Sequence, residues 1–394
     1  MKLNDKTTIV SCFIGYIVQA IINNFAPLLF ITFQNTYDIP LSQITLLVTI
    51  NFGVQLLVDL IAARFVDKIG YRTSIVAAHG FSAAGLVLLS FLPDVMDPFA
   101  GILISVMTCS IGGGIIEVLI SPIMESCPTD NKEKAMSLLH SFYCWGHVGV
   151  VLLSTLFFKM AGIGNWRLLA LIWAVIPVVN GIIFSKTPIA PLISSNERGL
   201  TLQELFKSKI FWVLMLMMLC AGASEQAVSQ WASAFAEQGL GISKTAGDLA
   251  GPMTFAILMG SGRAIYGKYG DRINLDQFML ISSSLCIVSY LLASIAPSPI
   301  ISLIGCGLCG FTVAIMWPGT FSKAAAALRT GGTAMFAMLA LAGDLGCSAG
   351  PTLVGMVSNA ADGNMKAGIL AAIIFPVILT VCLLAQRRKN ADHS

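Results

Sequence analysis

Long apolar runs, separated by short polar or charged segments, make up most of the sequence. Each run holds roughly 20 predominantly apolar residues, the length at which an α-helix crosses the hydrocarbon core of a bilayer. Charges and clusters of Pro, Gly and Asn mark the ends of the predicted helices. The twelve predicted spans lie near residues 8–33, 42–66, 73–93, 98–124, 135–158, 166–185, 209–236, 246–267, 276–296, 299–321, 332–358 and 365–386.

One polar connection is longer than the others and divides the chain in two. We predict a first six-helix bundle over residues 1–185, a cytoplasmic linker over 186–208 and a second six-helix bundle over 209–394. Within the linker, residues 201–207 are expected to form a short amphipathic turn on the membrane surface. The chain is therefore expected to have two structural halves of equal helix number.

The composition supports the membrane class. Of the 394 residues, 56% are hydrophobic and 11% are charged, and the mean hydropathy is +0.83. Soluble domains have about 25% charged residues. The first apolar run is too long for the apolar region of a cleavable signal peptide. We therefore expect an all-α integral membrane protein.

Several classes of function lack their sequence signals. There is no Lys/Arg-rich block for nucleic acid and no GxxxxGK[ST] motif for an ATP-driven pump, and no HExxH or GxSxG motif for an enzyme lies in any loop. The ten cysteines lie almost all in apolar runs. Cys306 and Cys309 are three positions apart, but on a span they are expected to be small packing residues. No metal site, disulfide framework or cofactor is expected.

Basic residues predict the orientation. Most of the 23 lysines and arginines fall in connections on the same side of the membrane as the N-terminus. Because cytoplasmic loops carry an excess of Lys and Arg, we expect both termini to be cytoplasmic. The compact loops favour a plasma membrane, and specifically a bacterial inner membrane.

The two halves repeat one another. Three features recur in the same order: Asp67 with Asp271, Pro122 with Pro318, and Gly146 with Gly343. Parallel repeats of this kind predict two pseudo-symmetric six-helix bundles, with a binding site at mid-membrane depth between them.

Glu117 places a carboxylate in the middle of the fourth apolar run. A charge at the bilayer centre costs about 2.5–3.5 kcal/mol on insertion scales, and such groups usually serve ion or substrate movement. We expect Glu117 to bind both a proton and substrate. The alternative is a protonated Glu117 that only hydrogen-bonds a neighbouring helix. His147 and Asp344 are further candidates for proton coupling, although a packing histidine and a structural ion pair would explain them as well.

Polar and aromatic side chains on the spans could bind a hydroxyl-rich solute. Gln226, Ser229 and Gln230 share one helix face by their spacing, and amides offer both donors and acceptors. Hydrogen bonding between helices is the alternative explanation. The predicted substrate-binding residues, besides Glu117, are Asn23, Asn24, Gln55, Glu225, Gln226, Ser229, Gln230, Trp231 and Trp317.

A second set of charged residues is expected to act in gating or in structure. Two of them, Asp59 and Arg263, lie within spans, and Asp344 is a candidate partner for Arg263. The predicted gating or structural residues are Asp59, Asp67, Lys68, Arg72, Arg263, Asp271 and Arg272.

The loop Asp67-Lys68-x-Gly70-Tyr71-Arg72 resembles the signature between helices 2 and 3 of the major facilitator superfamily, with Ala63 in place of its usual leading Gly. This resemblance covers nearly the whole chain and implies transport by alternating access. In that family, the aspartate of the signature is understood to hold the neighbouring end of helix 11.

A finer resemblance is to the fucose–galactose–glucose:proton symporter group. Pro27 departs from the group, which has an aspartate at that position in helix 1. The matching residues are Gly114, Glu117, Ser121 and Pro122 in span four, His140, Phe142 and Gly146 in span five, and Asn23, Asn24, Phe33 and Gln34 in span one.

Together, these features predict a monomeric secondary transporter of a small polar solute. We expect a sugar or polyol, coupled to the proton gradient through Glu117, with sodium as the alternative ion. Efflux or antiport of an organic anion or drug-like solute is the alternative within transport. A non-transporting receptor on the same fold is the alternative outside it.

Overall fold

The structure is a computed structural model that describes residues 4–190, 199–230, 253–362 and 364–391, with single positions 232 and 251. By its internal contacts the chain forms two compact units. Unit 1 comprises Met1–Pro128, Phe142–Leu200 and Thr330–Ala337, and unit 2 comprises Thr129–Ser141, Thr201–Arg329 and Met338–Ser394. Within the described ranges the regular structure is entirely helical.

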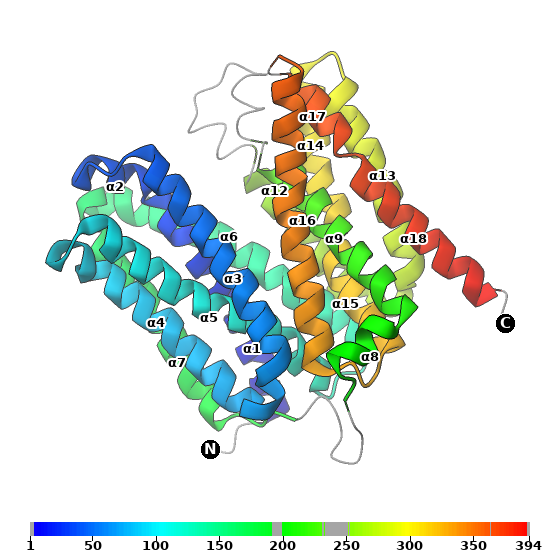
Figure 1. Cartoon of the computed structure of the whole chain (residues 1–394), viewed down its shortest axis with the longest axis horizontal. Coiled ribbons are helices and arrows are strands. Elements are labelled where there is room, and N and C mark those ends of the chain that lie inside the picture. The colour runs from blue at the N-terminus through cyan, green and yellow to red at the C-terminus, as the bar shows by residue number, and fades with distance from the viewer. Residues whose placement is uncertain are drawn as a thin grey trace. The chain divides into compact units, whose positions relative to one another are not determined.

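Unit 1 contains most of the first-half helices (Figure 1). They are α1 (Asp5–Leu28), α2 (Phe30–Tyr37), α3 (Leu41–Ile69), α4 (Tyr71–Val95), α5 (Pro98–Ser126), η1 (Ile163–Asn165) and α7 (Trp166–Lys186). The apolar helix α5 packs against α1, α3 and α4, and α7 packs against α1 and α4. The helix that carries Glu117 is therefore surrounded by three others of its own unit.

Unit 2 contains the second-half helices. They are α8 (Leu202–Lys207), α9 (Lys209–Ser229), α12 (Thr254–Tyr269), η3 (Gly270–Arg272), α13 (Leu275–Ile295), α14 (Pro299–Val313), α15 (Met316–Ala327), α17 (Met365–Ala371) and α18 (Ile374–Ala391). Helix α9 packs against α14, α15 and α18, and α12 packs against α14. At the predicted turn the structure has the short helix α8, where Thr201 and Glu204 form a reciprocal capping box; its place on the membrane surface stays a prediction.

Two long helices contribute to both units. In α6 (Lys132–Ala161) and α16 (Gly332–Ala360), the first turns belong to one unit and the remainder to the other. The sequence-based boundaries at 185/186 and 208/209 stay predictions, although α7 ends at Lys186 and α9 begins at Lys209.

The predicted all-helical membrane fold is confirmed. Among the described residues, ten helical segments are long and apolar enough to cross a membrane. Helices α3 and α12 lie at the second and eighth predicted spans. Residues 231, 233–236, 246–250 and 252 of the seventh and eighth predicted spans lie outside the described residues.

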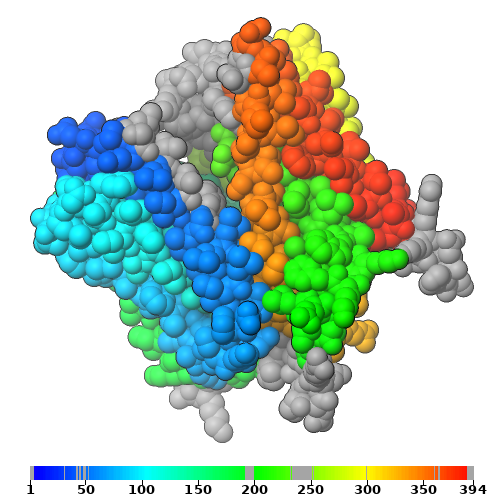
Figure 2. Space-filling view, viewed as in Figure 1, coloured from blue at the N-terminus to red at the C-terminus, as the bar shows by residue number. Residues whose placement is uncertain are grey.

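Large apolar side chains cover the outer faces of several helices, as a lipid-facing surface requires. In unit 2, α18 (red) lies at the surface of the space-filling view (Figure 2). Exposed residues of this kind include Leu168, Ile172, Val175, Val179 and Ile182 on α7, and Val377, Val381 and Leu384 on α18.

Two predicted spans are broken where a proline removes a backbone donor. Pro376 lacks the N–H that Ala372 would bind in an unbroken helix, and the Ala372 carbonyl accepts from Phe375 N instead. Pro318 likewise leaves the Ala314 carbonyl without its helical donor, between α14 and α15. A side chain from another helix supplies that missing donor.

Candidate functional site

Glu117 on α5 is bound by an amide from α1. Gln19 Nε2 donates to Glu117 Oε2 at 2.7 Å, and Gln19 is 4% exposed. Hydrogen bonds to a charged group are stronger than those between neutral groups, typically about 1.5–3 kcal/mol. The geometry shows a carboxylate held in a fixed place inside a membrane-spanning helix bundle.

Further polar contacts lie one turn away from this pair on both sides. Toward the start of α1, the hydroxyls of Tyr16 and Ser121 lie 2.9 Å apart. Toward its end, Gln55 Nε2 on α3 donates to Asn23 Oδ1 at 3.0 Å. Because α1 residues four apart face the same way, Asn23 and Gln19 present one polar stripe to α3 and α5.

The predicted substrate-binding amides therefore separate into two kinds. Asn23 and Gln55 contact each other beside the Glu117 level. Asn24 instead donates to the carbonyl of Ala20 in its own helix at 2.8 Å, so its amide is engaged locally. Gln55 and Asp59 are four apart on α3 and both are buried.

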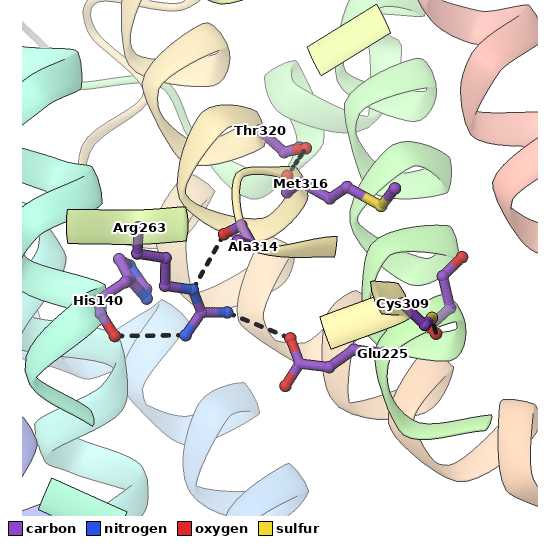
Figure 3. A network of polar contacts seen from close by, with 8 residues as sticks. His140, Glu225, Arg263, Cys309, Ala314, Met316 and Thr320 are labelled. Carbon is purple, nitrogen blue, oxygen red and sulfur yellow. Dashed lines mark hydrogen bonds and ion pairs between the residues drawn. The ribbon is translucent and has the colours of Figure 1, made fainter. Parts of the chain in front are cut away.

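In unit 2, Arg263 on α12 lies at the centre of a buried polar network (Figure 3). Its Nε donates to the Ala314 carbonyl at 3.0 Å, one Nη to the His140 carbonyl at 3.3 Å, and the other Nη to Glu225 Oε2 at 3.2 Å. Arg263 thus supplies the donor that Pro318 cannot. Its side chain is 4% exposed and that of Glu225 is 14% exposed.

Of the other residues predicted in unit 2, Trp317 is buried and its indole lies over Gly343 of α16. Gln226 and Ser229 are partly buried and Gln230 is exposed at the end of α9. Trp231 lies outside the described residues. The structure also shows Asp344 as partly buried on α16, and its pairing with Arg263 stays a prediction.

In unit 1, His147 on α6 is partly buried. Its coupling role and those of Glu117 and Asp344 stay predictions. Gly146, directly before His147, faces α1, since a Cβ there would lie 2.9 Å from Ala20 Cβ.

The charged loop residues have mainly structural contacts. Arg72 donates to the Ser185 carbonyl at 2.7 Å and so caps the end of α7. Lys68 lies over the ring of Phe65. Asp271 pairs with Lys134 of α6, and the Lys134 hydrogen bond lowers the pKa of the exposed Asp271 carboxyl.

Gln19 is the residue that the sequence reasoning missed. Its position four residues before Asn23 was the available signal, because that spacing places both amides on one helix face. A second missed network joins α4 and α7: His79 contacts the Ile75 carbonyl and the Asn180 amide, each at 2.8 Å. This histidine is 1% exposed and satisfied on both ring nitrogens, which is typical of a structural role.

Close packing of α9 on α16 fixes the helix that carries Glu225. A Cβ at Gly350 would lie 2.5 Å from the carbonyl oxygen of Ala223, which is backbone and cannot give way. We expect Gly350→Ala to lower the thermal stability by about 1–3 kcal/mol through overpacking. Gly80→Ala is the matched control, since a Cβ there meets nothing within 4 Å. An equal melting temperature for the two purified variants would contradict this packing.

These features define the class of the protein. Twelve spans that carry buried carboxylates, amides and an ion pair are typical of a polytopic membrane transporter. The chain belongs to the Major Facilitator Superfamily, whose family model matches residues 9–351. It is therefore a multi-pass membrane transporter of this family and not an enzyme. No curated protein sequence matches the chain significantly.

Solved structures of sugar:proton symporters share the fold. The E. coli fucose:proton symporter is 15% identical, with a TM-score of 0.82 over 95% of this chain and 97% of that chain. A proton:xylose symporter, solved with 6-bromo-6-deoxy-D-glucose, is 12% identical, with a TM-score of 0.79 over 96% of this chain and 94% of that one. The predicted resemblance to the fucose-permease-like group is thus supported at the level of fold.

The human organic anion transporter MFSD10 has the same fold. It is 15% identical, with a TM-score of 0.75 over 96% of this chain and 99% of that chain. Since both sugar transporters and an organic anion transporter share this fold, the fold alone does not identify the transported solute.

Proposed function

We propose that the protein moves a sugar or polyol across the membrane together with protons, by alternating access, with Glu117 as the proton-binding group. The observation that carries this proposal is the Glu117 carboxylate inside a membrane-spanning helix, held at 2.7 Å by the Gln19 amide. A transporter alternates between an inward-facing and an outward-facing conformation. A group whose protonation changes the relative stability of these two conformations can couple a proton gradient to transport.

Amides and hydroxyls around this carboxylate support a hydroxyl-rich solute. Asn23, Gln55 and Tyr16 lie within one turn of the Gln19–Glu117 pair. Such groups can both donate to and accept from sugar hydroxyls. We further propose that the protein acts as a monomer in a bacterial inner membrane with both termini in the cytoplasm, as the distribution of basic residues favours.

Uptake by proteoliposomes tests the proposal. Labelled L-fucose, D-xylose, D-glucose and sorbitol are compared under a pH gradient, under a sodium gradient and with no gradient, beside a labelled aromatic carboxylate. We expect at least one sugar or polyol to accumulate only under the pH gradient. Transport of the carboxylate alone would overturn the sugar proposal, and accumulation under the sodium gradient alone would overturn proton coupling.

Gln19→Leu is expected to change the pH dependence of uptake. The variant removes a donor that stabilises the charged form of Glu117, worth about 1.5–3 kcal/mol. At 1.36 kcal/mol per pH unit, the midpoint of uptake against pH moves upward by roughly one to two units. Asn24→Leu is the matched control, because Asn24 bonds its own helix and not Glu117. An unchanged midpoint in Gln19→Leu would show that this amide does not set the protonation of Glu117.

A further inference from the structure

The positive charge of Arg263 is fixed in place by backbone groups. Its Nε binds the Ala314 carbonyl, which Pro318 leaves without a helical donor, and an Nη binds the His140 carbonyl. In addition, Ser137 Oγ donates to the backbone carbonyl of Arg263 at 2.8 Å. Arginine does not lose its proton in proteins. The guanidinium therefore stays charged and anchored whether or not Glu225 is bound to it.

Glu225, in contrast, is held by one oxygen. Within the described part of the chain, its contact is the 3.2 Å bond from Arg263 to Oε2. Figure 3 shows the dashed line from the guanidinium ending on one carboxylate oxygen of Glu225. A bidentate arginine–carboxylate pair, with two parallel hydrogen bonds to both carboxylate oxygens, would hold the Glu225 side chain more tightly. Glu225 is thus the member of the pair that can leave.

The backbone next to Glu225 is fixed, so that leaving requires only rotation of its side chain. The carbonyl of Ser224 accepts a hydrogen bond from Tyr290 OH at 2.8 Å and a weaker one from Cys309 Sγ at 3.9 Å. Both donors come from helices packed in unit 2, α13 and α14. Helix α9 is therefore held at the residue that precedes Glu225.

The surrounding groups that can change charge near pH 7 are the carboxylates and His140. Thiols and phenols are ordinarily neutral near pH 7, arginine is ordinarily charged, and histidine ordinarily titrates at about pH 6.5. The ionisable groups around this part of α9 and its arginine partner include His140 on α6, Arg263 on α12, Cys286 and Tyr290 on α13, Cys306 and Cys309 on α14, Lys323 on α15, Asp344 and Cys347 on α16, and Cys382 on α18. Lys323 is paired with Asp276, and Glu225 is the carboxylate that the described contacts place at the guanidinium.

We propose that Glu225 is a second proton-binding site of the transport cycle, which takes up a proton when its side chain leaves Arg263. The proton converts the carboxylate to a neutral acid, while Arg263 keeps its charge and its two carbonyl partners. This inference rests on the proposed function, in which Glu117 binds the first proton. Each solute molecule then moves with two protons.

Two protons per solute predict a different limit of accumulation from one. A gradient of one pH unit is worth a factor of about 10 per proton, so one proton allows a ratio of about 10 and two allow about 100. The ratio is measured at steady state in proteoliposomes, with the membrane potential held at zero by potassium and valinomycin. The probe is the labelled solute that accumulates most among L-fucose, D-xylose, D-glucose and sorbitol.

We expect a ratio of about 100 for the unaltered protein and about 10 for Glu225→Gln, at one proton fewer per solute. Asp130→Asn, at an exposed carboxylate, is the matched control and keeps the ratio of the unaltered protein. If Glu225→Gln is poorly recovered because it leaves Arg263 without its carboxylate, Glu225→Gln combined with Arg263→Gln removes both charges. The double variant is also expected to reach about 10.

The remaining outcomes separate the two proposals. A ratio of about 10 in both the unaltered protein and Glu225→Gln, at one proton per solute, overturns the role of Glu225 and leaves that of Glu117 intact. A loss of the second proton in Asp344→Asn, with none in Glu225→Gln, assigns the second site to Asp344 and overturns the inference. No accumulation of any of the four sugars and polyols by the unaltered protein overturns both proposals.

Discussion

Glu117→Gln is expected to lower the accumulation ratio of sugar under a one-unit pH gradient by about tenfold, the share of one proton, while downhill movement of the same sugar continues. Glutamine keeps the size of the side chain and can still hydrogen-bond Gln19 and the solute. It cannot gain or lose a proton, so this position no longer contributes to the response of the inward-facing and outward-facing states to pH. The ratio should fall from about 100 to about 10 with Glu225 as the second proton site, and from about 10 to about 1 with Glu117 as the single one.

The measurement compares steady-state uptake with exchange of labelled for unlabelled sugar in the same vesicles. Exchange reports folding and binding and needs no net proton movement. An accumulation ratio in Glu117→Gln equal to that of the unaltered protein would contradict the proposed role of this carboxylate. Loss of both accumulation and exchange would point instead to a role in binding or folding.

Arg263→Ala is expected to cause the largest loss of stability among single substitutions in unit 2. It leaves the carboxylate of Glu225 buried without its cation, and breaking a buried pair in this way costs about 3–5 kcal/mol. It also leaves the Ala314 carbonyl without a donor, at about 1–3 kcal/mol more. At about 2–4 °C per kcal/mol, the Tm falls by roughly 10 °C or more.

Thermal unfolding of the purified protein, followed by tryptophan fluorescence, measures this difference. Arg167→Ala is the matched control. Arg167 also pairs with a carboxylate, Asp94, at 2.8 Å, but this pair is 35% and 44% exposed and should contribute no more than about 1 kcal/mol. Equal Tm losses for the two variants would show that the Arg263 network does not stabilise unit 2.

The sequence was sufficient for the spans because a bilayer imposes a length and a polarity on each helix. It was less informative about where spans break. Pro122 lies within the continuous helix α5, whereas Pro318 follows a break between α14 and α15. At the break, the free carbonyl of Ala314 accepts a hydrogen bond from Arg263, which lies 51 residues earlier in the chain. No local sequence pattern identifies a donor at that distance.

In the candidate site, too, the local sequence identifies single residues but not their contacts with distant ones. Glu117 could be chosen because one carboxylate in an apolar run is expensive wherever it lies. Gln19 could not be matched to it, since the two are 98 residues apart and their contact depends on how α1 packs on α5. Similarly, Glu225 could be selected as an intramembrane acid, but its contact with Arg263 depends on the packing of α9 and α12 in unit 2.

Proton movement caused by the sugar itself tests the central claim most directly. Proteoliposomes that contain a pH-sensitive dye, with no imposed gradient and the membrane potential held at zero, receive from outside the sugar or polyol that accumulates most. The account predicts that the interior acidifies as this solute enters and that Glu117→Gln moves at least one proton fewer per solute. Sugar entry into vesicles of the unaltered protein with no change of internal pH would contradict it.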